Sequence, residues 1–321
     1  MSKMLLIILR IKCCIWYFII YDKRGCKLME CTLCHSEHCD LIHAQIRNDD
    51  ENKFKMYACE NCKTHFIYPL PTELEDYYDG QFREEVHTAQ YYSVEKLETV
   101  FQKFMAEAKR RVARVENDLC HTDEILEIGC SVGYFLAAIQ DKVSVAYGTE
   151  WDSKARWFIE EQVNSPKIHV KKNPQDFQKK FDKIFLFHVL EHIEDPVQFL
   201  TELKPLLKEN GKIYIEVPNV DDILVKTYQC QEFMDFYYKK AHLYNFNEKG
   251  LQYVFDASGY DYDIRFIQRY DISNHLYWLA NRKPHGMGKY ADILSEQLDQ
   301  VYRDNLIKAK QSDTLFAILT L

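Results

Sequence analysis

The sequence predicts an α/β protein in which a small cysteine-based unit and a helical linker precede one large doubly wound domain. Three observations lead to this fold class. Apolar strand-like runs alternate with helical stretches beyond residue 121, two glycines mark the turn between the first of these strands and its helix, and two Cys-x-x-Cys pairs stand near the start of the chain. Alternating strands and helices are typical of a mostly parallel sheet with helices on both faces.

Length and composition agree with a soluble enzyme, which we expect to lie in the cytoplasm. The chain has 321 residues, of which 47% are hydrophobic, and a formal net charge of −8. This length suits one large domain with small appendages. Because the net charge is negative and Lys and Arg form no cluster, nucleic acid is not expected as the main partner. The sequence predicts no particular oligomeric state.

The first 28 residues differ in character from the rest of the chain. Residues 4–21 are apolar except for Arg10 and Lys12, and two charges midway make a poor transmembrane helix. Residues 1–28 are therefore predicted to be a non-native or disordered extension that contributes nothing to the fold, and no integral membrane span is expected. The alternative is an anchor that lies on a membrane surface.

Four cysteines predict a structural metal site. Cys31 with Cys34 and Cys59 with Cys62 form two Cys-x-x-Cys pairs that offer four thiolates to one tetrahedral ion. This spacing predicts a zinc ribbon over residues 29–68. A closed four-cysteine site leaves no open coordination position, so the Zn²⁺ would be structural. Two disulfides or four free thiols are the alternatives, and the nearby residues that could substitute as ligands are His35, His38, Cys39 and His65.

Residues 69–120 change from a turn-rich to a helical character. Apolar residues recur at helical spacing between Leu97 and Val115, with charged residues between them. The segment is predicted to be a helical linker or cap ahead of the large domain. Its first half also carries the tyrosines Tyr77, Tyr78, Tyr91 and Tyr92.

The large domain opens with a strand over residues 124–128 that runs into a helix beginning near Tyr134. Between them, Gly129 and Gly133 can adopt positive φ angles and let a flat ligand approach without meeting a Cβ atom. This property suits a nucleotide-like cofactor. Plain packing of a strand against a helix also uses glycine, and that is the alternative.

The second strand, predicted over residues 143–149, ends at Glu150. An acid at this place, about 20 residues past the glycines, can accept two hydrogen bonds from a ribose diol. A solvated carboxylate is the alternative, and Trp151 would pack either on an adenine ring or in the core. The residues predicted to bind the cofactor are Glu127, Gly129, Ser131, Gly133, Tyr134, Glu150, Trp151 and His188.

Further segments complete a set of four ordered motifs. A buried-looking strand over residues 181–187 leads into His-Val-Leu-Glu-His-Ile-Glu-Asp-Pro at 188–196. A fifth strand at 211–219 ends in Val-Pro-Asn, and His-Leu-Tyr-Asn-Phe-Asn at 242–247 is expected to open a helix. Together with the glycine turn, in which Ser131 replaces the middle glycine of acid-x-Gly-x-Gly-x-Gly, these motifs resemble class I S-adenosylmethionine-dependent methyltransferases, from residue 121 to about 268.

The resemblance implies a Rossmann-like seven-stranded sheet with an antiparallel last strand, S-adenosylmethionine as cofactor, and a methyltransferase domain over residues 121–321. Residues from about 269 to 311 would be an insertion between the sixth and seventh strands that shapes the acceptor site. The helical linker would cap the cofactor. The order of ribbon, linker and domain resembles the zinc-binding methyltransferases of bacterial sugar and surface-polysaccharide pathways, which implies a sugar or nucleotide-sugar substrate.

Methyl transfer from a sulfonium is an in-line displacement that depends on positioning, and a hydroxyl acceptor must also lose a proton. Histidine suits this task because its pKa is near neutrality. The candidate bases are His242, after the fifth strand, and His188, at the end of the fourth, whereas His192 is assigned to packing. In related sugar C-methyltransferases the base is the histidine of a Glu-His pair, which His242 matches, but Ala241 replaces the glutamate.

This departure favours methylation of a hydroxyl over methylation of carbon, and the latter stays open. A second alternative is a non-catalytic module that binds S-adenosylmethionine and uses zinc for partner contact. A third is methylation of a protein or an RNA base. Against the third, the fifth strand carries Val217-Pro218-Asn219 in place of the Asn/Asp-Pro-Pro-aromatic signature of amino-group methyltransferases.

Overall fold

The computed structural model describes residues 29–49, 51–71 and 94–321. The predicted extension over residues 1–28 lies outside the described residues. The same holds for the first part of the predicted linker, which includes Tyr77, Tyr78, Tyr91 and Tyr92. The second part of the linker forms one long helix, α3 (Val94–Val115).

The large domain is built on a seven-stranded sheet within the described residues, in the order β10-β11-β8-β7-β4-β5-β6. Strand β11 runs antiparallel to both of its neighbours, while the pairs from β8 to β6 are parallel. This topology confirms the predicted fold class, including the antiparallel last strand. The strands are β4 (Glu124–Ile128), β5 (Val145–Thr149), β6 (Ile168–Lys171), β7 (Phe181–Phe187), β8 (Leu207–Pro218), β10 (Asp261–Ile267) and β11 (Thr314–Thr320).

Helices cover both faces of this sheet, which explains why its central strands are apolar on both sides. Alternate residues of β4 face opposite layers: Ile125 packs with residues of α3 and α4, whereas Leu126 belongs to the core that α6 and α9 cover. The helices are α4 (Tyr134–Ile139), α5 (Ser153–Phe158), α6 (Pro196–Leu203), α7 (Ile223–Lys226), α8 (Gln231–Tyr237), α9 (Glu248–Ser258), α10 (Ile272–Asn281) and α11 (Glu296–Lys308), with short turns η2 (Glu116–Asp118), η3 (Ile159–Val163), η4 (Pro174–Phe177), η5 (Leu190–His192) and η6 (Lys204–Leu206).

A second sheet joins the cysteine unit to the large domain. Its order is β1-β2-β3-β9, where β1 (Cys39–His43), β2 (Lys55–Cys59) and β3 (His65–Tyr68) belong to the cysteine unit and β9 (Tyr244–Asn245) belongs to the large domain. In the register of this junction, Phe66 lies opposite Tyr244. The cysteine unit is therefore continuous with the large domain through backbone pairing.

The short strand β9 corrects one sequence prediction. Residues 242–247 were expected to open a helix, but the helix α9 begins only at Glu248, and Asn247 caps it by accepting a hydrogen bond from the Gly250 N–H. The preceding backbone pairs with β3 instead, and the Ile67 N–H donates to the Leu243 carbonyl at 3.0 Å. A partner that is distant in the sequence thus decides the local structure.

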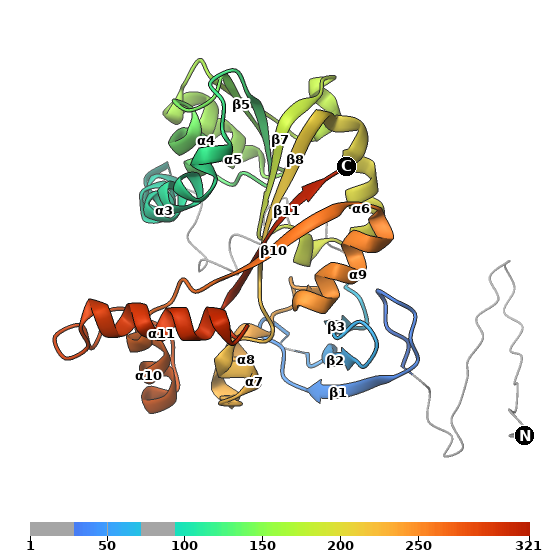
Figure 1. The fold of residues 1–321 in the computed structure, drawn as a ribbon, viewed down its shortest axis with the longest axis vertical. Helices are drawn as coiled ribbons and strands as arrows, with labels where there is room; N and C mark the ends of the chain where they lie inside the picture. Colours follow the sequence, from blue (N-terminus) through green and yellow to red (C-terminus); the bar gives the residue numbers. More distant parts are fainter. Residues whose placement is uncertain (1–28, 50, 72–93) are drawn as a thin grey trace, which may run out of the picture.

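The cysteine unit, helices α7 and α8, and helices α10 and α11 lie together below the large sheet in the view of Figure 1. Helices α10 and α11 come from the chain between β10 and β11, where the sequence predicted an insertion. Within the described part of the chain, no helix has both the length and the apolar character needed to cross a bilayer.

Candidate functional site

A cavity of about 1310 Å³ opens at the carboxyl ends of the parallel strands. Its wall includes the last residues of four of them, Ile128, Thr149, Phe187 and Pro218. Ligands of doubly wound folds bind at this edge of the sheet. Because pockets for one drug-sized ligand measure roughly 300 to 1,000 Å³, the cavity has room for a cofactor and an acceptor together.

The turn after β4 requires its two glycines for its own geometry. Gly129 and Gly133 have φ angles of 74° and 77°, in the left-handed region. A Cβ atom on Gly129 would lie 2.9 Å from Val189 Cγ2, and one on Gly133 would lie 2.8 Å from Ile159 Cγ1. Ser131, at the place of the missing glycine, also has a positive φ of 52°. The turn therefore keeps its left-handed shape although one glycine is replaced.

Glu150 is held in a fixed position beside this turn. Its two carboxylate oxygens accept hydrogen bonds from the backbone N–H groups of Ser131, at 2.8 Å, and Asp152, at 3.0 Å. Asp152 in turn caps the start of α5. Because each carboxylate oxygen has two lone pairs, Glu150 keeps the capacity to accept further hydrogen bonds from a ligand in the cavity.

Glu127 lies deeper than the cavity wall. It is 2% exposed, and its Oε2 atom has no hydrogen-bond partner among the described residues. Burial raises the pKa of Glu127, Arg111 opposes this shift and the charge of Glu150 adds to it, and together they bring the pKa to about 8.

The structure brings together most of the residues that the sequence predicted to hold the cofactor. Glu127 and Gly133 do not line the cavity: Gly133 is the residue at the start of α4, and Glu127 is buried in β4. The predicted cofactor residues in the cavity wall are Gly129, Ser131, Tyr134, Glu150, Trp151 and His188.

A buried ionic network lies beside His188 in the cavity wall. Glu216 on β8 is fully buried and accepts hydrogen bonds from Arg111 at 2.6 Å and Arg114 at 2.8 Å, both on α3. Burial alone would raise the pKa of Glu216, but the charge of Arg111 holds it well below its usual value. Nε2 of His188 lies 3.3 Å from Glu216 and 3.0 Å from Nη1 of Arg269.

Both ring nitrogens of His188 are engaged. Since a guanidinium group only donates, Nε2 accepts the hydrogen bond from Arg269, and Nδ1–H then donates to Oε1 of Glu191 at 3.1 Å. Burial is the largest influence on the pKa of Glu191 and would raise it, but the hydrogen bond with His188 and smaller contributions together outweigh burial, so the pKa is lowered. Glu191 is therefore a buried carboxylate whose place His188 fixes.

The same carboxylate lies beside the second candidate base. Oε1 of Glu191 is 3.9 Å from Nε2 of His242, and His242 is a cavity residue that is 6% exposed. Burial lowers the pKa of His242 well below its usual value, and Lys239 and Arg47 lower it further by their charge. The imidazole is therefore neutral at physiological pH, the form in which it can accept a proton.

His192 lies beside Glu191 and His242. Its Nδ1–H donates to the Ala241 carbonyl at 2.7 Å, and its ring meets that of His242 edge to face. Glu191, His192 and His242 each offer a ligand atom within 4.8 Å of the others, which is the spacing of a metal site. The nearby positive charges of Lys239 and Arg47 oppose a metal cation at this place, so the set fits a metal poorly.

The cavity wall near His188 and His242 also contains other polar and aromatic side chains. Burial, together with the charge of Asp313, raises the pKa of Asp222 to about 8. The hydroxyl of Tyr237 is buried without a hydrogen-bond partner among the described residues. No local pattern in the sequence marks Asp222 or Tyr237 as a cavity residue, and Glu191 lies within the motif at 188–196 without being singled out. The wall here is completed by Phe233, Phe236, Arg269, Tyr270, Asn274 and Trp278.

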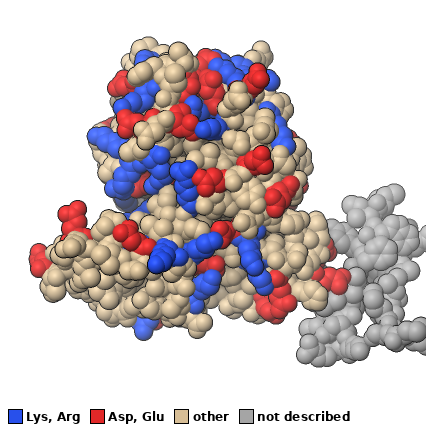
Figure 2. Space-filling model, viewed as in Figure 1, with Lys and Arg blue, Asp and Glu red and all other residues tan. Residues whose placement is uncertain are grey.

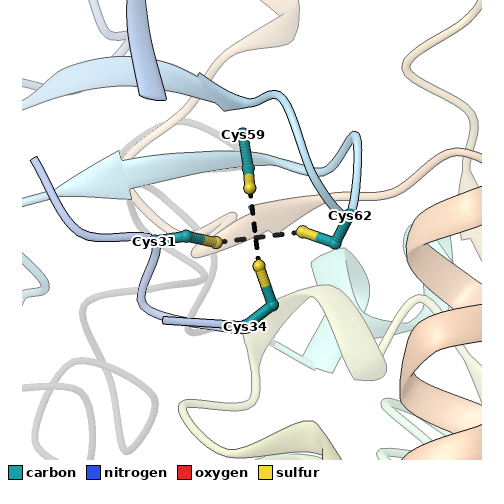
Figure 3. Close-up of side chains that lie close together, drawn as sticks. All are labelled: Cys31, Cys34, Cys59 and Cys62. Atoms are coloured by element: carbon teal, nitrogen blue, oxygen red, sulfur yellow. Dashed lines mark hydrogen bonds between the residues drawn. The ribbon is translucent and has the colours of Figure 1, made fainter. Parts of the chain in front are cut away.

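The four predicted metal ligands converge at the cysteine unit. Figure 3 shows the sulfurs of Cys31, Cys34, Cys59 and Cys62 pointing at a common centre. The sulfurs of Cys31 and Cys62 are 3.8 Å apart, those of Cys34 and Cys59 are 3.5 Å apart, and all four lie within 4.8 Å of one another. A tetrahedral ion with Zn–S bonds of about 2.3 Å places its sulfurs about 3.8 Å apart, so the set fits Zn²⁺.

Residues near the four cysteines have other partners. Nδ1 of His65 lies 2.9 Å from the Tyr238 hydroxyl, and the thiol of Cys39 donates to the Ser36 carbonyl at 3.4 Å. Neither residue belongs to the four-sulfur cluster. The four cysteines named from the sequence are therefore the residues that would hold the ion.

Two family models match the chain. The methyltransferase domain family matches residues 95–263, and the zinc ribbon of transcription factor S-II (TFIIS) matches residues 29–67. The second match agrees with the four-cysteine cluster, and the first covers the glycine turn, the strands β4 to β8 and the segment that carries His242.

Single proteins match over shorter segments. The chain is 31% identical over 106 residues to a tRNA U34 carboxymethyltransferase of Campylobacter hominis, which is 30% of this chain and 37% of that protein. It is 28% identical over 146 residues to an uncharacterized protein of Methanocaldococcus jannaschii, 41% of this chain and 69% of the relative. A Haloferax volcanii complex of the Trm112 methyltransferase activator with a methyltransferase contains a similar chain. The TM-score is 0.49 and the identity is 13%, and the match covers 78% of this chain and 98% of that chain. The chain thus spans little more than a third of the first of these relatives.

Proposed function

The chain belongs to the methyltransferase domain family, which matches residues 95–263, and from this premise we propose that it transfers a methyl group to a hydroxyl of a sugar or a related polar small molecule. The family and the fold make it an S-adenosylmethionine-dependent methyltransferase with a structural zinc ion. The methyl acceptor would be a component of surface-glycan biosynthesis.

The residues at the glycine turn fit S-adenosylmethionine. Glu150, fixed by two backbone N–H groups, would accept hydrogen bonds from the ribose diol. Glu127 remains a predicted cofactor residue because of its place in the glycine motif, and it is buried in β4 behind the cavity wall. When bound, the cofactor supplies a methyl group on a sulfonium. The task of the chain is to hold and align both substrates.

Substitution Glu150→Ala is expected to weaken S-adenosylmethionine binding by about 1.5 to 3 kcal/mol, the range for hydrogen bonds to charged groups. Titration calorimetry measures this loss directly. Glu161→Ala is the matched control, because Glu161 is an exposed acid near α5 and does not line the cavity. Equal affinity in the wild type and the Glu150→Ala variant would exclude the ribose contact.

The single observation that carries the proposed general base, which a hydroxyl acceptor requires, is the pair formed by Glu191 and His242. Ala241 precedes His242 where the related sugar C-methyltransferases have a glutamate. Glu191 instead supplies a carboxylate, which lies 3.9 Å from Nε2 of His242. The neutral imidazole would take the proton of the acceptor hydroxyl, and the carboxylate would stabilise the imidazolium that forms. His188 has both nitrogens engaged, so its proposed role is to position Glu191.

The composition of the cavity wall supports an acceptor of the sugar class. Aromatic side chains such as Trp278 and Phe233 can cover the apolar face of a ring, while Asn274 and Asp222 can bind its hydroxyls. Figure 2 shows Lys and Arg side chains interspersed with Asp and Glu on the face in view. A mixed surface of this kind offers less to a phosphate backbone than a basic one.

The proposal is tested by incubating the full chain with isotopically labelled S-adenosylmethionine and a panel of free sugars, nucleotide-linked sugars and their deoxy analogues. Mass spectrometry locates the added methyl group. Label on a sugar oxygen supports the proposal, and label on a sugar carbon replaces it with C-methylation. S-adenosylmethionine binding without label on any member of the panel or on RNA would favour the non-catalytic module.

A tRNA base is the second candidate acceptor, because curated relatives that are 27–31% identical over 106–141 residues are named tRNA U34 carboxymethyltransferases. Unmodified tRNA therefore belongs in the same assay. Label in tRNA and not in any sugar would move the function to RNA modification.

The cytoplasm is the proposed site of action. Within the described part of the chain, four cysteines gather in the zinc cluster. Thiols that hold a metal persist in a reducing compartment, whereas an oxidising one favours disulfides.

A further inference from the structure

Arg269 contacts two side chains through separate nitrogens of its guanidinium group. Nε donates to Oδ1 of Asp313 at 2.9 Å, and Nη1 donates to Nε2 of His188 at 3.0 Å. All three residues line the cavity. Arg269 therefore connects the start of β11 to the imidazole at the end of β7.

The segment between β10 and β11 holds Arg269 from both of its ends. Asp313, the last residue before β11, also accepts hydrogen bonds from the backbone N–H groups of Arg269, at 2.7 Å, and Tyr270, at 3.0 Å. Arg303 on α11 donates to the Arg269 carbonyl at 2.8 Å. The place of the guanidinium group therefore depends on the fold of this segment, which the sequence predicted to shape the acceptor site.

Nε2 of His188 has two possible partners. One is the Arg269 guanidinium, which only donates, and the other is Oε1 of Glu216 at 3.3 Å, which only accepts. Glu216 already accepts hydrogen bonds from Arg111 and Arg114. Because Arg269 lies nearer, Nε2 is the acceptor of its hydrogen bond, and the ring proton is on Nδ1.

The proton on Nδ1 orients Glu191. Nδ1–H donates to Oε1 of Glu191 at 3.1 Å, and the same oxygen lies 3.9 Å from Nε2 of His242. In a histidine, the nitrogen that carries the proton is set by the hydrogen bond that the other nitrogen makes. A ring with its only proton on Nε2 would turn a lone pair toward the carboxylate and repel it. The contact between Arg269 and His188 thus affects the carboxylate beside the proposed base.

We propose that Arg269 is a positioning residue, which keeps the ring proton of His188 on Nδ1 and thereby directs Glu191 toward His242. Through Arg269, the segment between β10 and β11 takes part in catalysis as well as in forming the cavity wall. The inference rests on the proposed function, because His242 is the base in that proposal. An arginine suits this place because its planar fork can serve two partners at once, whereas a lysine has a single nitrogen.

The test is nitrogen NMR spectroscopy of the full chain with isotopically labelled histidine, saturated with S-adenosylhomocysteine. The ring of His188 is assigned by the loss of its signals in His188→Gln. In the wild type Nδ1 should carry a proton and Nε2 should not. In Arg269→Lys and Arg269→Met, Nε2 should gain a proton, because Glu216 is then its partner. Arg265→Met is the matched control, since Arg265 pairs with Asp263 on β10 and does not line the cavity.

The two variants of Arg269 keep the test independent of folding. Arg269→Lys retains a positive charge beside Asp313, so it should fold even if Arg269→Met does not. The affinity for S-adenosylhomocysteine reports the fold of each variant. A wild-type ring that carries a proton on Nε2, or an Nε2 that stays without a proton in every folded variant, overturns the positioning role. A change in Arg269→Met alone retains this role and assigns it to the charge of the arginine.

Steady-state kinetics on the acceptor found with the panel give a second readout. In Arg269→Lys, kcat should fall by about 10- to 100-fold, the loss that one hydrogen bond to a charged group represents, with KM for S-adenosylmethionine unchanged. In a chain that already carries Glu191→Gln, the same substitution should have almost no further effect, because Arg269 acts through Glu191. An equal further loss in that chain overturns the positioning role.

The spectroscopic result needs no acceptor, so it separates this inference from the proposed function. If the His188 ring responds to Arg269 but no sugar of the panel is methylated, the proposed function falls and the control of His188 by Arg269 stands. If a sugar is methylated and the ring does not respond to Arg269, the function stands and the positioning role falls.

Discussion

Turnover of the His242→Ala variant is expected to fall by about 100- to 10,000-fold, the usual contribution of a positioned general base. The S-adenosylmethionine affinity should stay unchanged, because His242 is assigned to the acceptor and is not among the predicted cofactor residues. Steady-state kinetics on the acceptor found with the panel measures the first quantity, and calorimetry measures the second. A fall in turnover at unchanged S-adenosylmethionine affinity distinguishes loss of the base from loss of the fold.

Three further variants make this prediction specific. Glu191→Gln keeps the shape of the side chain but removes its charge, so turnover should fall while stability changes little. His192→Ala removes the hydrogen bond to the Ala241 carbonyl and should mainly lower stability. His188→Ala should reduce turnover less than His242→Ala does. If His188→Ala abolishes turnover while His242→Ala retains it, the base lies at the end of β7.

The pH profile checks the same assignment without a mutation. A general base must be neutral, and burial lowers the pKa of His242 well below its usual value. The acidic limb of kcat should therefore lie well below pH 6.5, the ordinary value for histidine being about 6.5. Loss of turnover centred near or above pH 6.5 would assign the base to a different, more exposed group.

Substitution Cys62→Ser should remove the zinc ion and lower the melting temperature by about 10–20 °C, because binding energy at a structural zinc site is also folding energy. Metal analysis should give one zinc per wild-type chain. Activity should fall with zinc content, since β3 of the cysteine unit pairs with β9 two residues after His242. A metal-free wild type of equal stability would contradict this prediction.

Cys39→Ser and Cys120→Ser are the controls for the metal. Cys39 lies near the cluster but donates to the Ser36 carbonyl, and Cys120 is exposed and distant in the sequence. Both variants should keep zinc and the wild-type melting temperature. Loss of zinc in Cys39→Ser would extend the ligand set beyond the four cysteines of Figure 3.

Local sequence patterns predicted those parts of the molecule that depend on local physics. Strand β4 and helix α4 were placed correctly because an apolar run, a turn with glycines and a helical run follow one another within a few residues. The cysteine cluster was predictable because the ligands of structural zinc sites typically occur as Cys-x-x-Cys pairs in the sequence. The antiparallel last strand and the enzyme class came from the resemblance of four ordered motifs, and both are confirmed.

What the sequence did not predict depends on contacts between distant segments. Residues 242–247 were expected to open a helix, but they contain strand β9. No feature of these residues shows that Phe66 and its neighbours pair with them. Glu191 lies within a recognised motif, yet its position beside His242 follows from the fold alone. Arg269 and His188 meet for the same reason. The roles of the predicted cofactor residues and of His242 remain predictions until the variants above are measured.

The pairing of β3 with β9 has a consequence for how the two parts of the chain change over time. A metal-binding module joined only by a linker could be exchanged or lost, but here Phe66 and Tyr244 share a backbone ladder and a core. A substitution at one of these positions therefore alters the fit of the other. Among relatives that keep both modules, positions 66 and 244 should vary together, and lineages that lose the four cysteines should also show a redesigned segment around residue 244.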